Sequence, residues 1–155
     1  NGVDNEFIKS LISINFTRLI LFFIFFFISG YFFYASLYAA VAGAVDNDTD
    51  TQQFMLPLSL PLILTFIVAQ FIAENPDGAI AFWFSIIPFT SPIAMLIRIP
   101  FGIEAVQTWE IILSCSLMII GCIASSWIAA KIYRTGILMY GKKITYKDLW
   151  KWIRN

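Results

Sequence analysis

Residues 19–45 read LILFFIFFFISGYFFYASLYAAVAGAV and contain no charged side chain. About 20 apolar residues are enough for a helix to cross the hydrocarbon core of a bilayer. The first half of the stretch is large and rich in Phe, which suits contact with lipid tails. The second half holds many Gly, Ala and Ser residues, which let helix backbones approach closely. The stretch therefore predicts a membrane-spanning helix that packs on other helices.

Three more apolar stretches follow, at residues 54–73, 78–97 and 110–131. The first and the last each match one membrane thickness. The middle one contains Pro88 and Pro92, which a single straight helix accommodates poorly. A re-entrant hairpin of two short helices fits it better, because irregular backbone survives at membrane depth only when protein or a watery cavity covers it. The predicted fold is all-α: a polytopic helical membrane protein with three transmembrane helices, a re-entrant helical hairpin and a basic tail at 132–155.

Composition limits the function. The chain is 59% hydrophobic and only 13% charged, so a water-soluble fold of this size could not bury its apolar surface. Its net charge is +0, which gives no basic field for nucleic acid. The chain has no His, so no Cys/His metal site is expected, and no catalytic set or GxxxxGK[ST] phosphate loop occurs. We therefore expect neither a cofactor nor an enzyme.

Charge is distributed unevenly between the predicted loops. Seven of the ten basic residues lie from Lys131 onward, which predicts a cytoplasmic C-terminus. They are also positioned to contact anionic lipid headgroups. Separately, residues 145–154 are typical of a short amphipathic helix, which suits the inner membrane surface. With a hairpin at 78–97, seven basic residues lie inside and three outside; with four full spans, nine lie inside and one outside. The positive-inside rule mildly favours four spans, whereas the two prolines favour the hairpin.

Several longer segments resemble one known family. These segments are GYFFYASLYAAVAGAVDNDTDTQQFMLPLSLPLIL (30–64), ENPDG (74–78), FSIIPFTSPIAMLIRIPFG (84–102) and AAKIYRTGILMYGKK (129–143). Together they resemble the C-terminal half of type-2 ABC exporter permeases, most closely the bacterial branch of sodium-extruding permease subunits. The resemblance covers about residues 17–154.

The resemblance implies a permease fragment with the last three spans and the re-entrant hairpin, in the bacterial cytoplasmic (inner) membrane. It implies that ATP is hydrolysed on a separate ABC ATPase subunit and that a second permease copy completes a dimer. The substrate would be a sodium ion or a lipid-like or amphipathic compound. A non-transporting membrane scaffold or assembly subunit is the alternative.

Two groups of residues are candidates for function. The resemblance implies that the first would gate the outer exit, and a structural plug there is the alternative. This group consists of Ser85, Pro88, Thr90, Ser91, Pro92 and Arg98. Arg98 is expected to form a surface ion pair with Glu74. The second group is expected to contact the ATPase subunit or to be a solvated loop and first helical turn, and consists of Asp46, Asp48, Asp50, Gln52 and Gln53.

Overall fold

The computed structural model describes residues 16–45, 48–102, 106–136 and 145–154, and the regular elements among these residues are all helical. Three helices are long. They are α2 (Phe16–Ala44), α3 (Asp48–Glu74) and α6 (Thr108–Gly136).

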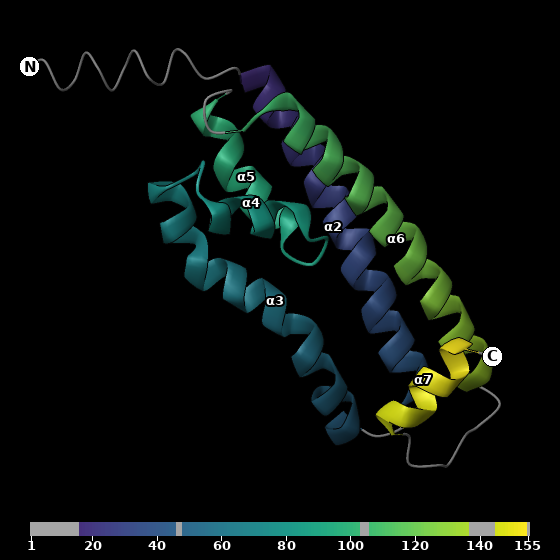
Figure 1. The fold of residues 1–155 in the computed structure, drawn as a ribbon. Coiled ribbons are helices and arrows are strands. Elements are labelled where there is room, and N and C mark those ends of the chain that lie inside the picture. Colours follow the sequence, from purple (N-terminus) through teal and green to yellow (C-terminus); the bar gives the residue numbers. More distant parts are fainter. Residues whose placement is uncertain (1–15, 46–47, 103–105, 137–144, 155) are drawn as a thin grey trace, which may run out of the picture.

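Shorter elements complete the described chain (Figure 1). They are α4 (Ala79–Ile86), α5 (Ser91–Arg98), the 3-10 turn η1 (Ile99–Phe101) and α7 (Tyr146–Arg154). The predicted all-α membrane fold, with three spans and a helical hairpin, is confirmed.

The three long helices contain 29, 27 and 29 residues. At 1.5 Å per residue each is about 40 Å long, more than the roughly 30 Å of a hydrocarbon core. Each also contains a window apolar enough to cross a membrane. Their outer faces carry large exposed apolar side chains, including Phe66 (77% exposed) and Ile123 (66% exposed). Such faces are stable in contact with lipid and not with water.

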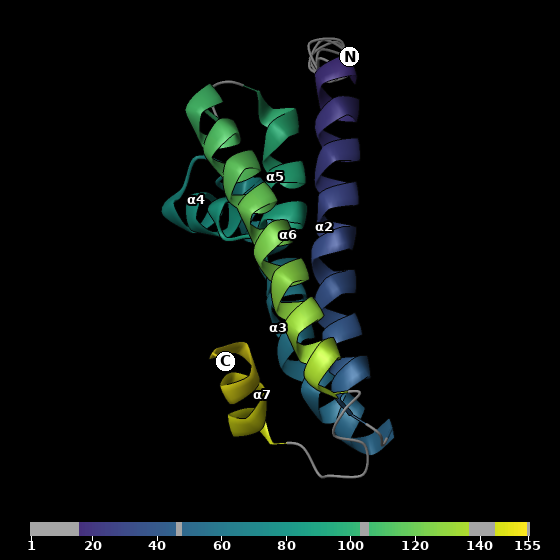
Figure 2. The same cartoon turned by 90° about the vertical axis from the view of Figure 1, so that its right-hand side faces the viewer.

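Helices α2 and α6 pack along each other over most of their length (Figure 2). Their shared core has three levels. At the level of the hairpin, Phe26 packs with Met95 and Ile111; halfway along, Phe33 packs with Met118; at the far end, Ala40 packs with Ile132. This pair of helices is the frame on which the hairpin and α7 are placed.

The chain reverses at residues 87–90, so α4 and α5 form a hairpin and not one span. The Tyr34 hydroxyl, near the middle of α2, donates to the Phe89 carbonyl at the hairpin tip. At the same level Gly121, near the middle of α6, meets Pro88. The hairpin thus enters from one end of the bundle and turns halfway along it (Figure 1). The alternative with four full spans does not hold in this structure.

Helix α7 lies where the sequence predicts an amphipathic helix in the tail, and its apolar face packs on the long helices. Leu149, Trp152 and Ile153 pack against the ends of α2 and α6. Trp150 alone of the predicted apolar side is exposed, at 71%. The sequence pattern identified the apolar face correctly, but it could not show that protein already covers that face.

Candidate functional site

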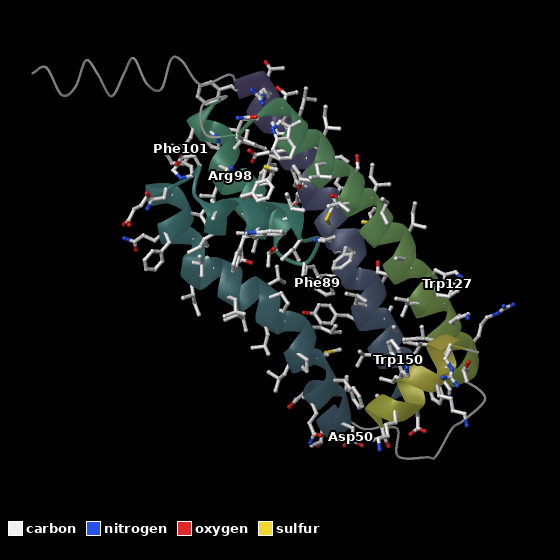
Figure 3. The ribbon with its side chains drawn as sticks, in the orientation of Figure 1. Asp50, Phe89, Arg98, Phe101, Trp127 and Trp150 are labelled. Atoms are coloured by element: carbon white, nitrogen blue, oxygen red, sulfur yellow. The ribbon has the colours of Figure 1, made fainter. Side chains whose placement is uncertain are left out.

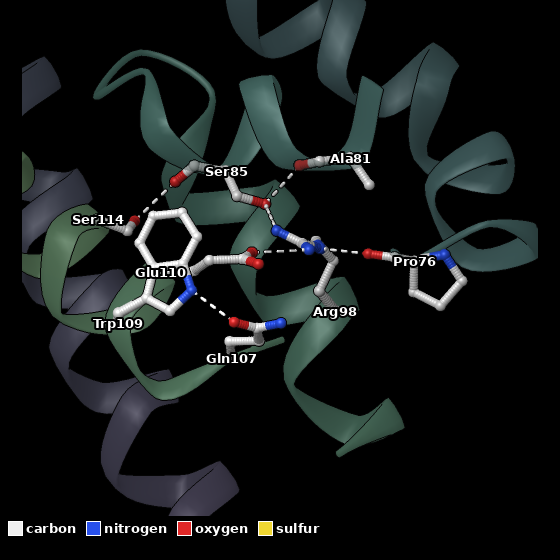
Figure 4. Close-up of polar contacts among 8 residues, drawn as sticks. All are labelled: Pro76, Ala81, Ser85, Arg98, Gln107, Trp109, Glu110 and Ser114. Atoms are coloured by element: carbon white, nitrogen blue, oxygen red, sulfur yellow. Dashed lines mark hydrogen bonds and ion pairs between the residues drawn. The ribbon is translucent and has the colours of Figure 1, made fainter. Parts of the chain in front are cut away.

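The base of the hairpin holds a fully buried arginine. Arg98 is the last residue of α5 and is 0% exposed. Its Nη2 lies 2.8 Å from Glu110 Oε2, in the first turn of α6, and Glu110 is itself only 8% exposed. Its Nε donates to the Pro76 carbonyl, and its Nη1 donates to Ser85 Oγ at 3.1 Å (Figure 4). One guanidinium therefore joins α5 to α4, to α6 and to the α3–α4 turn.

This arrangement corrects the predicted ion pair between Arg98 and Glu74. Glu74 is exposed and accepts a hydrogen bond from Gln70, whereas the buried carboxylate beside Arg98 is Glu110. The physical reason is the donor geometry of arginine, whose five N–H groups can satisfy several acceptors at once. A charge that is removed from water needs such partners. A single exposed acid such as Glu74 could therefore not stabilise Arg98 in its buried position.

Three buried serines continue the polar network from the arginine toward the hairpin tip. Ser114 Oγ, on α6, donates to the Ser85 carbonyl at 2.6 Å and lies 2.6 Å from Ser91 Oγ. All three side chains are 0% exposed. Ser85 Oγ in turn donates to the Ala81 carbonyl at 2.6 Å. The network ties the end of α4 and the start of α5 to the same face of α6.

We expect Ser114→Ala to lower the free energy of unfolding by about 1 kcal/mol, because it removes a hydroxyl that bonds across three helices. The matched control is Ser116→Ala. Ser116 is exposed, and its hydroxyl bonds only to the Ile112 carbonyl of its own helix. Unfolding in detergent by SDS titration compares the two variants. Equal losses would show that the serine network holds nothing in place.

Both hairpin prolines sit against glycines of the long helices. A Cβ atom added at Gly30 would lie 2.8 Å from Pro92 Cβ, and one added at Gly121 would lie 3.0 Å from Pro88 Cβ. Only glycine leaves space for a rigid pyrrolidine ring at these two points. Gly30 of α2 and Gly121 of α6 therefore make room for the hairpin.

The hairpin tip is held from within and from α2. Thr90 Oγ1 donates to the Phe84 carbonyl at 2.6 Å, which closes the turn. Phe89 packs edge-on against Phe33, with ring centroids 4.9 Å apart. All six predicted gate residues thus lie on the hairpin. Ser85, Ser91 and Arg98 join one polar network, whereas Pro88, Thr90 and Pro92 shape and seat the tip.

Sequence reasoning missed the partners on the long helices. Glu110 and Ser114 are four residues apart, a spacing that puts both on one face of α6. That pair of polar residues at the entrance of an apolar span was the available signal. Gly30 was assigned to helix packing in general, and nothing in the sequence connected it with Pro92.

An apolar groove of about 990 Å³ runs along α2 beside the hairpin. Its α2 wall includes Phe27, Tyr31 and Tyr34, and its hairpin wall includes Pro92 and Leu96. Leu62 of α3 contributes at one end. The groove therefore lies between the hairpin and the span that supports its tip.

Those predicted ATPase-contact residues that the structure describes lie at the other end of the molecule. Figure 3 shows Asp50 at the end opposite Arg98 and Phe101, with Phe89 between. Helix α3 begins at Asp48, so Asp48 and Asp50 lie at its start, as their charge near a helix N-terminus favours. Gln52 and Gln53 are exposed and Asp50 is half-buried. Asp46 lies outside the described residues.

Comparison with known proteins identifies the family of this chain. A family model described as "ABC-2 family transporter protein" matches residues 7–131. The chain belongs to the ABC-2 transporter family. With its three spanning helices, it is a multi-pass membrane protein of that family. The match does not separate the sodium-extruding branch from the rest.

Two relatives are similar over most of this ABC-2 chain. The uncharacterized protein MJ1024 of Methanocaldococcus jannaschii is 29% identical over 133 residues, which are 86% of this chain and 32% of that protein. The uncharacterized protein YhaP of Bacillus subtilis is 29% identical over 120 residues, 77% of this chain and 28% of that protein. The chain thus spans about a third of the length of these relatives. No solved structure matches it significantly.

Proposed function

We propose that this chain is the hairpin-bearing part of the permease of an ATP-driven ABC exporter, and that the hairpin closes the extracytoplasmic end of the transport path. The observation that carries the proposal is the hairpin itself. Its tip stops halfway along α2 and α6, and its base is fixed by the buried Arg98–Glu110 pair. A segment that enters halfway and is supported on both sides can block a path without crossing the membrane.

The proposed orientation follows from charge. Lys131, Arg134 and the basic residues of α7 lie at the end of the bundle away from the hairpin, so the positive-inside rule puts that end in the cytoplasm. The hairpin base then faces outward, and the start of α3 faces the compartment where ATP is present. We propose that an ABC ATPase subunit docks at that end, that a second permease copy completes a dimer, and that the membrane is a bacterial inner membrane.

The groove beside the hairpin favours a lipid-like or amphipathic substrate over a sodium ion. It is lined by aromatic and aliphatic side chains, and two of its three tyrosine hydroxyls already have partners: Tyr34 bonds to Phe89, and Tyr38 lies 2.8 Å from Ser59 Oγ. A sodium site needs a set of oxygen ligands, which these walls do not supply. An acyl chain needs apolar walls, which they do.

Co-purification tests the exporter proposal. We expect an ABC ATPase subunit to co-elute with the tagged full-length protein from its own host in mild detergent. Replacing Asp50, Gln52 and Gln53 together with alanine is expected to weaken that association severalfold, because the three lie on the proposed docking end. Replacing Thr108 and Gln107 with alanine, at the opposite end, is the matched control.

One result would contradict the exporter proposal, and another would contradict only the proposed substrate class. If no ATPase co-elutes in several detergents, a membrane scaffold or assembly subunit becomes the better account. If an ATPase co-elutes and its activity responds to sodium but to no amphipathic compound, the exporter proposal stands and the proposed substrate class is wrong.

A further inference from the structure

A basic stripe runs along the outer face of α7. It consists of Lys147, Lys151 and Arg154, all exposed. At 3.6 residues per turn these positions fall within about 60° of each other around the helix. The opposite face, with Leu149 and Ile153, packs on α2 and α6. The packing therefore fixes the direction of the stripe, which points away from the protein.

The depth of α7 is fixed by a second contact. Lys131 Nζ, on α6, donates to the Ile153 carbonyl at 3.0 Å, which supplies a partner for a carbonyl in the last turn of α7. Lys131 is the first charged residue after the uncharged run 111–130. The end of α7 therefore lies at the level where α6 leaves the hydrocarbon core.

Aromatic side chains gather at the same level. Lys131 Nζ lies 4.4 Å from the centre of the Trp127 ring. Trp127 is 55% exposed and Trp150 is 71% exposed, and Figure 3 shows both at this end of the bundle. Exposed Trp beside Lys and Arg is the composition of a membrane–water interface. The single acid of α7, Asp148, accepts a hydrogen bond from the Thr145 backbone N–H at the start of the helix.

We propose that the α7 stripe, flanked by Trp127 and Trp150, is a binding surface for the headgroups of anionic lipids. The basic groups lie at headgroup depth and face outward, so they meet lipid phosphates before they meet a protein in the cytoplasm. Each Lys or Arg near an anionic surface strengthens binding about fivefold. This surface goes beyond transport and does not depend on it, since it needs only the fold and its orientation in the bilayer.

Lipid binding by the full-length protein in dodecyl maltoside tests the proposal. Phosphatidylglycerol and phosphatidylcholine are added separately, and bound lipid is counted by native mass spectrometry over a concentration series. We expect the protein to bind phosphatidylglycerol at least tenfold more tightly than phosphatidylcholine. Replacing Lys147, Lys151 and Arg154 with glutamine is expected to lower the ratio of the two affinities at least tenfold. Inorganic phosphate at the same concentration is expected not to compete.

The matched control keeps the charge: Lys147→Arg, Lys151→Arg and Arg154→Lys together are expected to bind phosphatidylglycerol like the unchanged protein. The proposal is overturned if the glutamine variant keeps the preference, or if the charge-preserving variant loses it. Should the glutamine variant fail to fold, salt replaces it, since 0.5 M NaCl must then abolish the preference of the unchanged protein. Loss of ATPase co-elution with lipid binding intact would instead make the stripe a protein-docking surface.

Discussion

Replacing Arg98 with alanine is expected to lower the free energy of unfolding by about 3 to 5 kcal/mol. The substitution leaves the Glu110 carboxylate buried without its counter-charge and removes the donors to the Pro76 carbonyl and to Ser85 Oγ. Removing one partner of a buried ion pair destabilises a protein more than replacing both partners with apolar residues, because the remaining charge stays buried without a counter-charge. SDS titration in detergent, followed by circular dichroism, measures the loss.

Three companion variants separate this explanation from a general loss of packing. Arg98→Lys keeps the charge but not the planar fork of donors, so its loss is expected to be intermediate. Combining Arg98→Ala with Glu110→Ala is expected to recover part of the loss, since no orphan charge remains. Arg134→Ala, at an exposed position, is expected to stay within about 0.5 kcal/mol. A loss below about 1 kcal/mol for Arg98→Ala would mean that the pair does not hold the hairpin.

Replacing Gly30 with leucine is expected to displace the hairpin and to cost about 2 kcal/mol of stability. Even the Cβ atom of the new side chain would lie 2.8 Å from Pro92 Cβ, and the proline ring is too rigid to move aside alone. Because the Tyr34–Phe89 hydrogen bond lies one helical turn further along α2, we expect the tip to lose that support too. Unfolding by SDS titration and transport in reconstituted vesicles are the two readouts.

Ala42→Leu is the matched control for Gly30→Leu. It adds side-chain volume to the same helix at an exposed position, where lipid can adapt. It is expected to change stability by less than about 0.5 kcal/mol and to leave transport unchanged. If the two variants behave alike, the glycine is not a seat for the hairpin, and the close approach to Pro92 carries no function.

The spanning helices could be predicted because lipid imposes a simple rule. A run of about 20 uncharged residues has few alternatives in a membrane, and residues 54–73 fall inside α3 as the structure has it. The helices extend further than the runs, since α3 begins at Asp48 and α6 continues to Gly136. An uncharged run measures the hydrocarbon core, whereas a helix continues through the headgroup layer.

The partners inside the candidate site could not be predicted from the sequence. Acidic residues lie on both sides of Arg98 along the chain. Only the packing of α5 near the start of α6 determines that Glu110 is the one that forms the ion pair. The same holds for α7, whose apolar pattern suits lipid and protein equally well. Periodicity shows which face of a helix is apolar, but the fold determines what covers it.

The hairpin links these observations to the proposed transport. Polar contacts around Arg98 hold its base, whereas ring packing at Phe89 and the hydrogen bond from Tyr34 hold its tip. A segment held in this way can move as one piece if the base pair stays intact. Substitutions at the base should therefore reduce stability and transport together, whereas substitutions at the tip should reduce transport more.

Labelling of single cysteines with a membrane-impermeant maleimide tests the re-entrant hairpin most directly. Cys115 and Cys122 are first replaced with alanine, and Asp77→Cys, Gln107→Cys and Lys147→Cys are then introduced one at a time at exposed positions. We expect the cysteines at 77 and 107 to be labelled in intact cells and the cysteine at 147 to be labelled only after permeabilisation. Labelling at 107 but not at 77 in intact cells would put the two ends of the hairpin on opposite sides of the membrane and rule out a re-entrant hairpin.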